Sequence, residues 1–157
     1  MRPVELPPSV LEAIANHARE AYPEECCGFL IAGPDSQDPA GNRWIVAADP
    51  APNEFNGERR RRFLVRPEEL RAAETRLDGT GRGVVGFYHS HPDHPPRPSR
   101  FDQEHAWPWY SYLVVNVTAR AVGETRAFEL DPESSEFREV PLHIRSTTDR
   151  RATVAMR

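Results

Sequence analysis

The chain has 157 residues, of which 38% are hydrophobic and 28% charged, and a net charge of −4, a composition typical of one globular domain. The acidic balance argues against nucleic acid as a general partner, and no apolar stretch approaches the roughly 20 residues that span a membrane. Because the only cysteines are the adjacent pair Cys26 and Cys27 and the N-terminus has no signal-peptide core, we expect a cytoplasmic protein without a disulfide framework.

Two helices are predicted in the first half of the chain. The first covers about 10–21, where apolar residues recur at helical spacing after Ser9, and Ser9 and Glu12 have the form of a capping box. The second begins at Pro67 and ends before Gly79. The strands predicted for this half cover 24–32, 44–47 and 63–65, with turn residues over 33–42.

The second half is predicted to contain a buried strand over 84–89, which Pro92 ends, and a helix over about 99–106. Further strands are predicted over 112–117, 125–130 and 137–144. Helices and strands mix without strict alternation, which favours an α+β fold with a mixed, largely antiparallel sheet flanked by helices. We expect one domain over 1–145 and a mobile C-terminal tail over 146–157.

Two histidines follow the apolar run of the predicted strand at 84–89. His89 and His91 are separated by one residue, and residues i and i+2 of a strand point to the same face. Asp102 follows in the first turn of the next predicted helix. Two imidazoles and one carboxylate form a three-ligand set that suits zinc and leaves one position open, as catalytic sites do.

These residues resemble the signature of the JAMM (MPN-type) metallopeptidases. That pattern is a glutamate, then H-x-H, ten residues and an aspartate, with a serine three positions before the aspartate; here it is met by Glu25, His89, His91, Ser99 and Asp102. The segment from Pro23 to Gly28 is similar to the family's P-x-E-x-C-G. The resemblance covers roughly residues 5–140 and implies the cytidine-deaminase-like arrangement of the JAMM fold.

The resemblance also implies a role for each residue. His89, His91 and Asp102 would bind Zn²⁺, which lowers the pKa of its water to about 7. Glu25 would take a proton from that water and pass it to the leaving amine. Ser99 would donate a hydrogen bond to the oxyanion of the tetrahedral intermediate. Glu25 is preferred over Glu24 because it occupies the family's position.

Each of these residues also has a structural interpretation. Asp102 could act only by stabilising the positive N-terminal end of its helix, and Ser99 could be only the N-cap. Cys26 and Cys27 are interpreted as core residues, with a redox or metal thiol as the alternative. His94 and His105 are interpreted as surface histidines. The Arg59–Arg62 run is either a solvated charge run or a docking surface for an acidic partner beside the site, and the Pro95-Pro96-Arg97 loop has no assigned role.

The resemblance implies a zinc peptidase or isopeptidase that cuts after the C-terminal glycine of a ubiquitin-like protein, and the compact form points to small sulfur-carrier proteins. An extended glycine tail could add as a strand to a sheet edge. Two alternatives are a catalytically silent MPN-type scaffold, which the filled ligand positions disfavour, and a zinc amidohydrolase acting on a small molecule. A homodimer is compatible with the sequence, and no nucleic-acid or membrane partner is expected.

Overall fold

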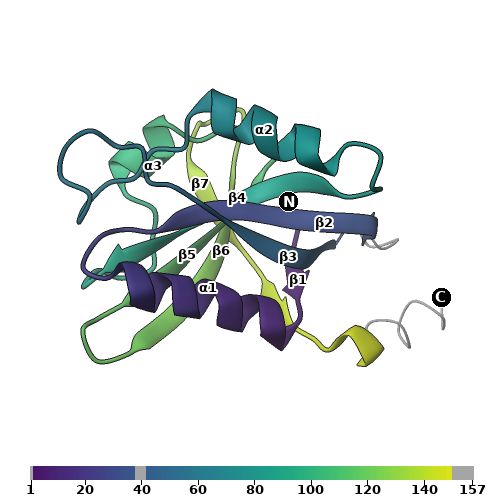
Figure 1. Ribbon diagram of the computed structural model, residues 1–157, viewed down its shortest axis with the longest axis horizontal. Helices are drawn as coiled ribbons and strands as arrows, with labels where there is room; N and C mark the ends of the chain where they lie inside the picture. Colours follow the sequence, from purple (N-terminus) through teal and green to yellow (C-terminus); the bar gives the residue numbers. More distant parts are fainter. Residues whose placement is uncertain (1, 38–41, 150–157) are drawn as a thin grey trace.

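The computed structural model describes residues 2–37 and 42–149. Its helices and strands are β1 (Val4–Leu6), α1 (Pro8–Ala21), β2 (Cys27–Gln37), β3 (Arg43–Ala51), α2 (Pro67–Leu77), β4 (Gly83–Pro92), α3 (Arg100–Glu104), β5 (Ser111–Val117), β6 (Val122–Leu130), β7 (Phe137–Val140) and β8 (Leu142–Ile144). The strands form one eight-stranded sheet in the order β7-β6-β5-β4-β2-β3-β1-β8 (Figure 1).

The sheet is mixed. β2 pairs antiparallel with β3 and β4, and β5 and β6, like β6 and β7, are antiparallel partners. β4 and β5 run parallel, and β1 runs parallel to both β3 and β8. The predicted α+β class with a mixed, largely antiparallel sheet is therefore confirmed. β4 lies in the middle of the sheet and is paired on both sides.

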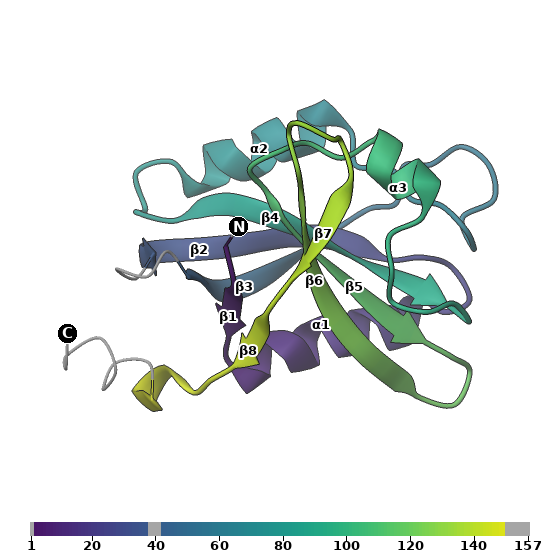
Figure 2. The ribbon, with the colours of Figure 1, turned by 180° about the vertical axis from the view of Figure 1, so that it is seen from behind.

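Helices cover both faces of the sheet (Figures 1 and 2). Val10, Ile14 and Ala18 of α1 are buried in a core cluster with residues of β2–β6 on one face. On the other face, Ala73 of α2 is buried in a second cluster that includes Phe87 of β4. Each cluster removes apolar side chains from water, at about 25 cal/mol per Å² buried, so the central strands are held between two apolar layers.

The start of α1 differs from the prediction. The helix begins at Pro8, its N-cap is Pro7, and no side chain caps it. The capping box predicted at Ser9 is therefore wrong, because Ser9 already lies inside the first turn. Proline at the first helical position needs no hydrogen-bond partner for its nitrogen and has a φ angle suited to a helix, so this end forms without a polar cap.

The strand predicted over 63–65 is also wrong. The segment 62–66 has no regular secondary structure, because the side chain of Asn53 binds its backbone: Leu64 N–H donates to Asn53 Oδ1 over 3.1 Å. The predicted strand 24–32 begins later, at Cys27, and continues to Gln37, so part of the turn predicted over 33–42 is strand. The remainder, 38–41, lies outside the described residues.

A buried arginine fixes the segment that follows α3. Arg43 of β3 is 1% exposed. Its Nη1 donates to the carbonyl oxygens of Val85 and Trp109, each over 2.9 Å, and to Ser111 Oγ over 3.0 Å. The guanidinium also lies 4.4 Å from the centre of the Trp109 ring. β3 thereby holds the connection between α3 and β5 against the sheet.

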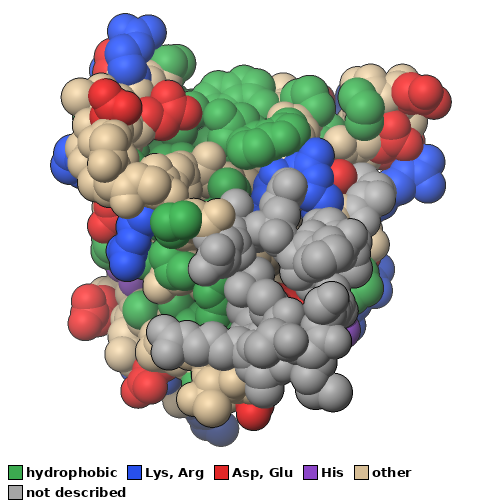
Figure 3. All heavy atoms as spheres, turned by 90° about the vertical axis from the view of Figure 1, so that its right-hand side faces the viewer, with side chains coloured by type: hydrophobic (Ala, Val, Ile, Leu, Met, Phe, Trp, Pro, Cys, Tyr) green, Lys and Arg blue, Asp and Glu red, His purple; other side chains and the backbone are tan. Residues whose placement is uncertain are grey.

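The end of the molecule at which β4 begins carries side chains of both charge signs around apolar ones (Figure 3). Within the described ranges, no helix is both long and apolar enough to cross a membrane. Most of the tail predicted over 146–157 falls outside the described residues, and its first part, 147–149, forms a helical turn.

Candidate metal centre

β4 presents His89 and His91 on the face of the sheet that α2 and α3 cover. Both backbones are fixed, because His89 is opposite Cys27 of β2 and Val114 of β5, and His91 is opposite Asn116 of β5. Both side chains are buried, at 1% and 6% exposure. The two Nε2 atoms lie 3.1 Å apart. The strand therefore brings both imidazoles together, as the i, i+2 spacing predicted.

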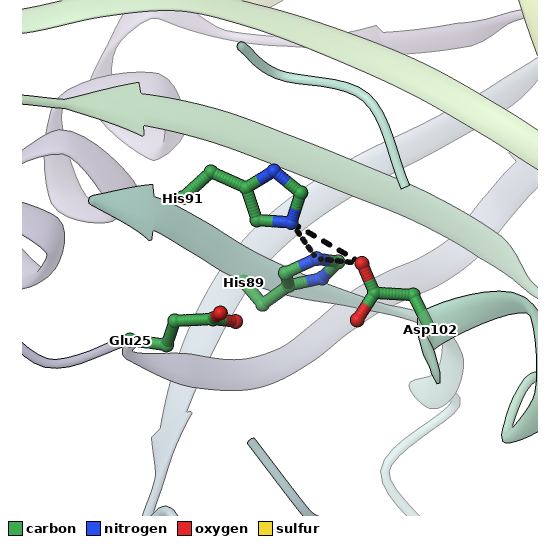
Figure 4. Close-up of side chains that lie close together, drawn as sticks. All are labelled: Glu25, His89, His91 and Asp102. Carbon is green, nitrogen blue, oxygen red and sulfur yellow. Dashed lines mark hydrogen bonds and ion pairs between the residues drawn. The ribbon is translucent and has the colours of Figure 1, made fainter. Parts of the chain in front are cut away.

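α3 brings Asp102 to the same point. Ser99 is the N-cap of this helix, and the two residues form a capping box: Asp102 N–H donates to Ser99 Oγ over 3.1 Å, and Ser99 N–H donates to Asp102 Oδ2 over 2.7 Å. The same Oδ2 lies 3.1 Å from His89 Nε2 and 3.2 Å from His91 Nε2 (Figure 4). The helix cap and the histidine contact thus use one carboxylate oxygen.

The surroundings of each imidazole set its orientation. His91 Nδ1 lies 2.9 Å from the carbonyl oxygen of Pro95. Because a carbonyl only accepts, this nitrogen carries the hydrogen, and the lone pair of neutral His91 is on Nε2, which faces the cluster. His89 is held by stacking on Phe63, with ring centres 4.4 Å apart, and its Nδ1 is buried without a hydrogen-bond partner.

Glu25 approaches the histidines from the turn before β2, not from the strand itself. Its backbone N–H donates to the carbonyl oxygen of Arg59 over 2.7 Å, and its carbonyl accepts from Asn53 Nδ2 over 3.1 Å. The carboxyl group is directed toward the cluster (Figure 4), yet its Oε1 is buried without a partner. Glu24 is exposed, whereas Glu25 is 3% exposed.

The pKa values of the two buried acids are shifted in opposite directions. Burial raises the pKa of Glu25 from 4.5 to about 9, and the neighbouring Asp102 carboxylate adds to the shift. Burial would also raise the pKa of Asp102, but the neighbouring His89 and the hydrogen bond from Ser99 N–H hold it well below its usual range. Burial lowers the pKa of His89. Asp102 is therefore the charged member of the cluster and Glu25 the neutral one.

The donor set fits a tetrahedral metal ion. The ligand atoms of Glu25, His89, His91 and Asp102 all lie within 4.8 Å of one another, and all four residues are buried. The two Nε2 atoms and Oδ2 form a triangle with sides of 3.1, 3.1 and 3.2 Å. Ligands about 2.0 Å from a tetrahedral zinc are about 3.3 Å apart. Two nitrogens and one oxygen are also the donors that zinc accepts.

Two hollows of about 420 Å³ each adjoin the cluster. The first is lined mainly by apolar and aromatic side chains together with His89 and Asp102: Phe63, Leu64, Val65, Pro67, Phe87, Phe101, Ala106, Trp107 and Tyr112, with Glu104 and His105. The second is lined by Glu25, His91, Ser99 and Pro95 together with His94, Arg61 and Arg97. Ser99 therefore borders the second hollow as well as capping α3.

Asn53 and Phe63 support the site, a role that the sequence did not assign to either residue. Asn53 binds the backbones of Glu25, Phe55, Arg62 and Leu64 at once, so it joins the Glu25 turn to the segment 62–66. Phe63 was assigned to a strand although its ring covers His89. An asparagine between Pro52 and Glu54 is typical of a loop, and no spacing signal distinguishes a loop residue that organises its neighbours from one that does not.

The remaining predicted positions lie at the edge of the site or in the core. Cys26 and Cys27 are buried free thiols, in agreement with the core interpretation. His105 is exposed and stacks on Phe101, with ring centres 4.0 Å apart, and His94 is exposed at the second hollow. Neither belongs to the buried group of possible metal ligands found among the described residues.

Comparisons with known proteins agree with this geometry. Residues 7–131 match the family described as prokaryotic homologs of the JAB domain. The desampylase of Haloferax volcanii is 33% identical over 138 residues, which cover 85% of this chain and 90% of that protein. A solution structure from Desulfitobacterium hafniense is similar with a TM-score of 0.76 at 26% identity, covering 91% of this chain and 93% of the other.

The fold extends to more distant structures. A JAB1/MPN domain protein from Archaeoglobus fulgidus has a TM-score of 0.52 at 18% identity, with 91% of this chain and 99% of that chain covered. The family match and the relative at 33% identity confirm the predicted JAMM resemblance. The family match over most of the chain, the relative at 33% identity and the shared fold lead to one conclusion: this chain belongs to the prokaryotic homologs of the JAB domain.

Proposed function

We propose that the chain is a zinc-dependent isopeptidase that hydrolyses the bond after the C-terminal glycine of a ubiquitin-like protein. The observation that carries the proposal is the buried donor triangle of His89, His91 and Asp102 with the unpartnered carboxyl of Glu25 beside it. The name of the relative from Haloferax volcanii, desampylase, supports a hydrolase of this kind. Within the substrate class we infer a small sulfur-carrier protein, as the compact form of the chain suggests.

The three donors would hold zinc through His89 Nε2, His91 Nε2 and Asp102 Oδ2. Zinc, when bound, supplies Lewis acidity that polarises a carbonyl group and makes hydroxide available near neutral pH. The protein contributes fixed donors: the carbonyl of Pro95 sets the tautomer of His91, and the N–H of Ser99 binds Asp102 Oδ2. Such partners of the ligands orient them for the metal.

Glu25 is the proposed general base. Its Oε1 is buried and accepts no hydrogen bond from the protein, so this oxygen is available to accept a proton. A nearby cation favours the ionised form of a carboxyl group, so Glu25 would be a base in the metal-loaded protein. It would accept a proton from the attacking water and pass it to the leaving nitrogen as the carbon–nitrogen bond breaks. Proton transfer by a positioned group contributes about 10²–10⁴ in rate.

Ser99 is the proposed oxyanion donor. A serine hydroxyl can accept and donate at the same time. Ser99 Oγ accepts the Asp102 N–H in the helix cap, which leaves its hydrogen available. Because the residue also borders the second hollow beside His91 and Glu25, that hydrogen can be directed at the substrate carbonyl oxygen. The capping and catalytic interpretations of Ser99 are therefore compatible.

The glycine tail of the substrate is proposed to occupy the aromatic hollow. Glu25 must reach the leaving nitrogen, and it lines the second hollow. The leaving group is therefore assigned to the second hollow and the glycine side of the scissile bond to the aromatic one. The sheet offers no free edge here, because β4 is paired with both β2 and β5. An extended tail would instead lie beside the segment 62–66, of which Phe63, Leu64 and Val65 line that hollow.

Hydrolysis of a defined adduct tests the proposal. The substrate is a ubiquitin-like carrier whose C-terminal glycine is joined to a leaving amine, assayed with the zinc-loaded protein with and without a chelator. We expect turnover that the chelator abolishes. Glu25→Gln should abolish turnover while zinc content stays stoichiometric, and its matched control Glu24→Gln, an exposed neighbour, should behave as wild type. Turnover that survives the chelator or Glu25→Gln would refute the proposed mechanism.

A further inference from the structure

The turn between α3 and β5 contains a tryptophan in a conformation that favours glycine. Pro108 and Trp109 form a turn, and the φ angle of Trp109 is 79°. Proline is typical of the second position of a type II turn, and the third position needs a positive φ angle, which is why glycine is preferred there. A bulky side chain at a positive φ angle is strained. Trp109 therefore keeps this conformation only because the surrounding structure stabilises it.

Two arginines stabilise this turn. Arg43 Nη1 donates to the Trp109 carbonyl oxygen over 2.9 Å, and Arg2 Nη1 donates to the same oxygen over 2.8 Å. The two guanidinium groups also lie 4.4 Å and 5.5 Å from the centre of the Trp109 ring, within the range of a cation–π interaction. The strained turn is thus held from β3 and from the segment before β1, by residues that are distant from it in the sequence.

The burial of Arg43 costs free energy. The residue is 1% exposed, and its Nη2 is buried without a hydrogen-bond partner among the described residues. Burial lowers the pKa of Arg43 from 12.5 to about 10, because the charged form is poorly solvated there. A buried charge that lacks part of its hydrogen bonding destabilises a fold, so stability alone does not account for an arginine at this position. Departures of this kind are typical of functional sites.

The turn is joined directly to a wall of the aromatic hollow. Trp107 lies two residues before Trp109, and all four residues of 104–107 line that hollow. The Trp107 N–H donates to the Tyr112 hydroxyl over 2.7 Å, and Tyr112 lines the same hollow. A change in the φ angle of Trp109 would redirect the chain that leads back to Trp107. It would thereby move this wall relative to the segment 63–65, which also lines the hollow.

We propose that Arg43 and Arg2 are positioning residues of the substrate site: by holding the Trp109 turn, they keep Trp107 where the aromatic hollow binds the carrier tail. This inference rests on the proposed function, which assigns the tail to that hollow. Neither arginine lines the hollow, so both act through the turn. Apparent affinity falls with the fraction of molecules in the binding-competent conformation. Loss of either arginine is therefore expected to raise KM and to leave kcat and the metal centre unchanged.

Steady-state kinetics of single variants test the proposal. The substrate is a ubiquitin-like carrier with a leaving amine on its C-terminal glycine, and the full zinc-loaded chain is used. We expect Arg43→Met to raise KM about tenfold and Arg2→Gln to raise it about threefold, the effects of losing a buried and a more exposed hydrogen bond to the Trp109 carbonyl. Zinc content and kcat should not change. Arg126→Gln is the matched control, because the Arg126 side chain is 30% exposed against 28% for Arg2 and also forms an ion pair.

Trp109→Gly separates support of the turn from a general effect on stability. Glycine adopts a positive φ angle without strain. In the Trp109→Gly background, the further change Arg43→Met or Arg2→Gln should therefore no longer raise KM, and the double-mutant comparison measures this coupling. If the arginines served only the stability of the core, each arginine change would have the same effect in both backgrounds. Because Arg2 is partly exposed, Arg2→Gln decides the question even if Arg43→Met does not fold.

Calorimetry gives the same comparison without turnover, through binding of the unconjugated carrier to zinc-loaded Glu25→Gln protein. Unchanged KM and affinity in the arginine variants, or equal losses in the wild-type and Trp109→Gly backgrounds, would overturn the inference and leave the hydrolase intact. A fall in kcat at unchanged KM would overturn it as well. Binding without hydrolysis by the wild-type chain would refute the proposed chemistry, and calorimetry would still decide the role of the arginines. A chain that neither binds nor hydrolyses the carrier would refute both.

Discussion

Asp102 and Glu25 are two buried acids in one cluster, and their surroundings differ completely. Asp102 belongs to the β4–α3 corner, where His89 Nε2, His91 Nε2 and Ser99 N–H all contact one carboxylate oxygen. Glu25 belongs to the turn before β2, where only its backbone is held and its Oε1 has no partner. The contrast shows how one site separates two tasks: a saturated carboxylate is fixed as a ligand, and an unsaturated one remains free to exchange a proton.

The largest effect is expected when the fixed acid is removed. In Asp102→Ala the donor triangle loses its only oxygen, so zinc binding and turnover should both fall to the level of chelator-treated protein. His91→Ala should act in the same way without unfolding the chain. Metal analysis of the purified variants is the measurement, and Glu104→Gln, an exposed acid of the same helix, is the control. Full zinc occupancy in Asp102→Ala would contradict the assigned ligand set.

The pH dependence of stability separates the two acids directly. A carboxyl whose pKa is raised on folding stabilises the protein at low pH, and this stability is lost as the pH rises from 4.5 toward about 9. Metal-free wild type should therefore lose up to about 4 kcal/mol relative to metal-free Glu25→Gln over three pH units. Asp102 has the opposite sign: its contribution is present above pH 3.8 and is lost only as the pH falls further.

Urea unfolding of both proteins with chelator, from about pH 5.5 to about pH 8.5, is the measurement for this prediction. Parallel stability curves for wild type and Glu25→Gln would mean that Glu25 finds a partner in solution, and the contrast between the two acids would then disappear.

Removing the Ser99 side chain tests whether the proposed oxyanion donor can be lost without loss of the metal ligand Asp102, with which Ser99 shares a capping box. Ser99→Ala should lower kcat about 10²–10³-fold through loss of the oxyanion donor, and lower the free energy of unfolding by about 1 kcal/mol through loss of the cap. Asp102 stays in place through its histidine contacts, so zinc should still bind. A variant that loses metal as readily as Asp102→Ala would show that Ser99 acts by capping α3 and holding Asp102, and not as an oxyanion donor.

Asn53→Ala is expected to have the smallest effect on turnover. It should disturb the position of Glu25 and leave the three proposed metal ligands in place. Loss of the side-chain bonds to Glu25 and to the segment 62–66 should lower kcat about tenfold, the cost of a modest misplacement of the base, with zinc affinity unchanged. Asn16→Ala on the exposed face of α1 is the control. Equal loss of zinc affinity and kcat would place Asn53 in support of the ligands instead.

The parts of the site that were predictable are those coded by local spacing. The i, i+2 histidines and the cap-plus-three position of Asp102 follow from strand and helix geometry, and the family resemblance selected Glu25. The supporting roles of Asn53, Phe63 and Arg43 were not predictable, because each acts on a residue far away in the chain. Asn53 binds Glu25, 28 positions away, and Arg43 binds Ser111, 68 positions away. The short strand predicted over 63–65 was wrong for a similar reason: the backbone of Leu64 bonds to the side chain of Asn53 and to the N–H of Glu54, neither of which belongs to a strand.

The three residues of β1 protect two strands of the sheet at once. β1 lies between β3 and β8 and pairs with both, and Arg145 N–H donates to the Leu6 carbonyl over 3.0 Å. A proteolytic cut that released β1 would uncover the side of β3 and detach β8 together. Bare strand edges are templates for aggregation, so trimming of a few N-terminal residues would threaten the solubility of the whole chain, and cleavable expression tags should leave Pro3 to Leu6 intact.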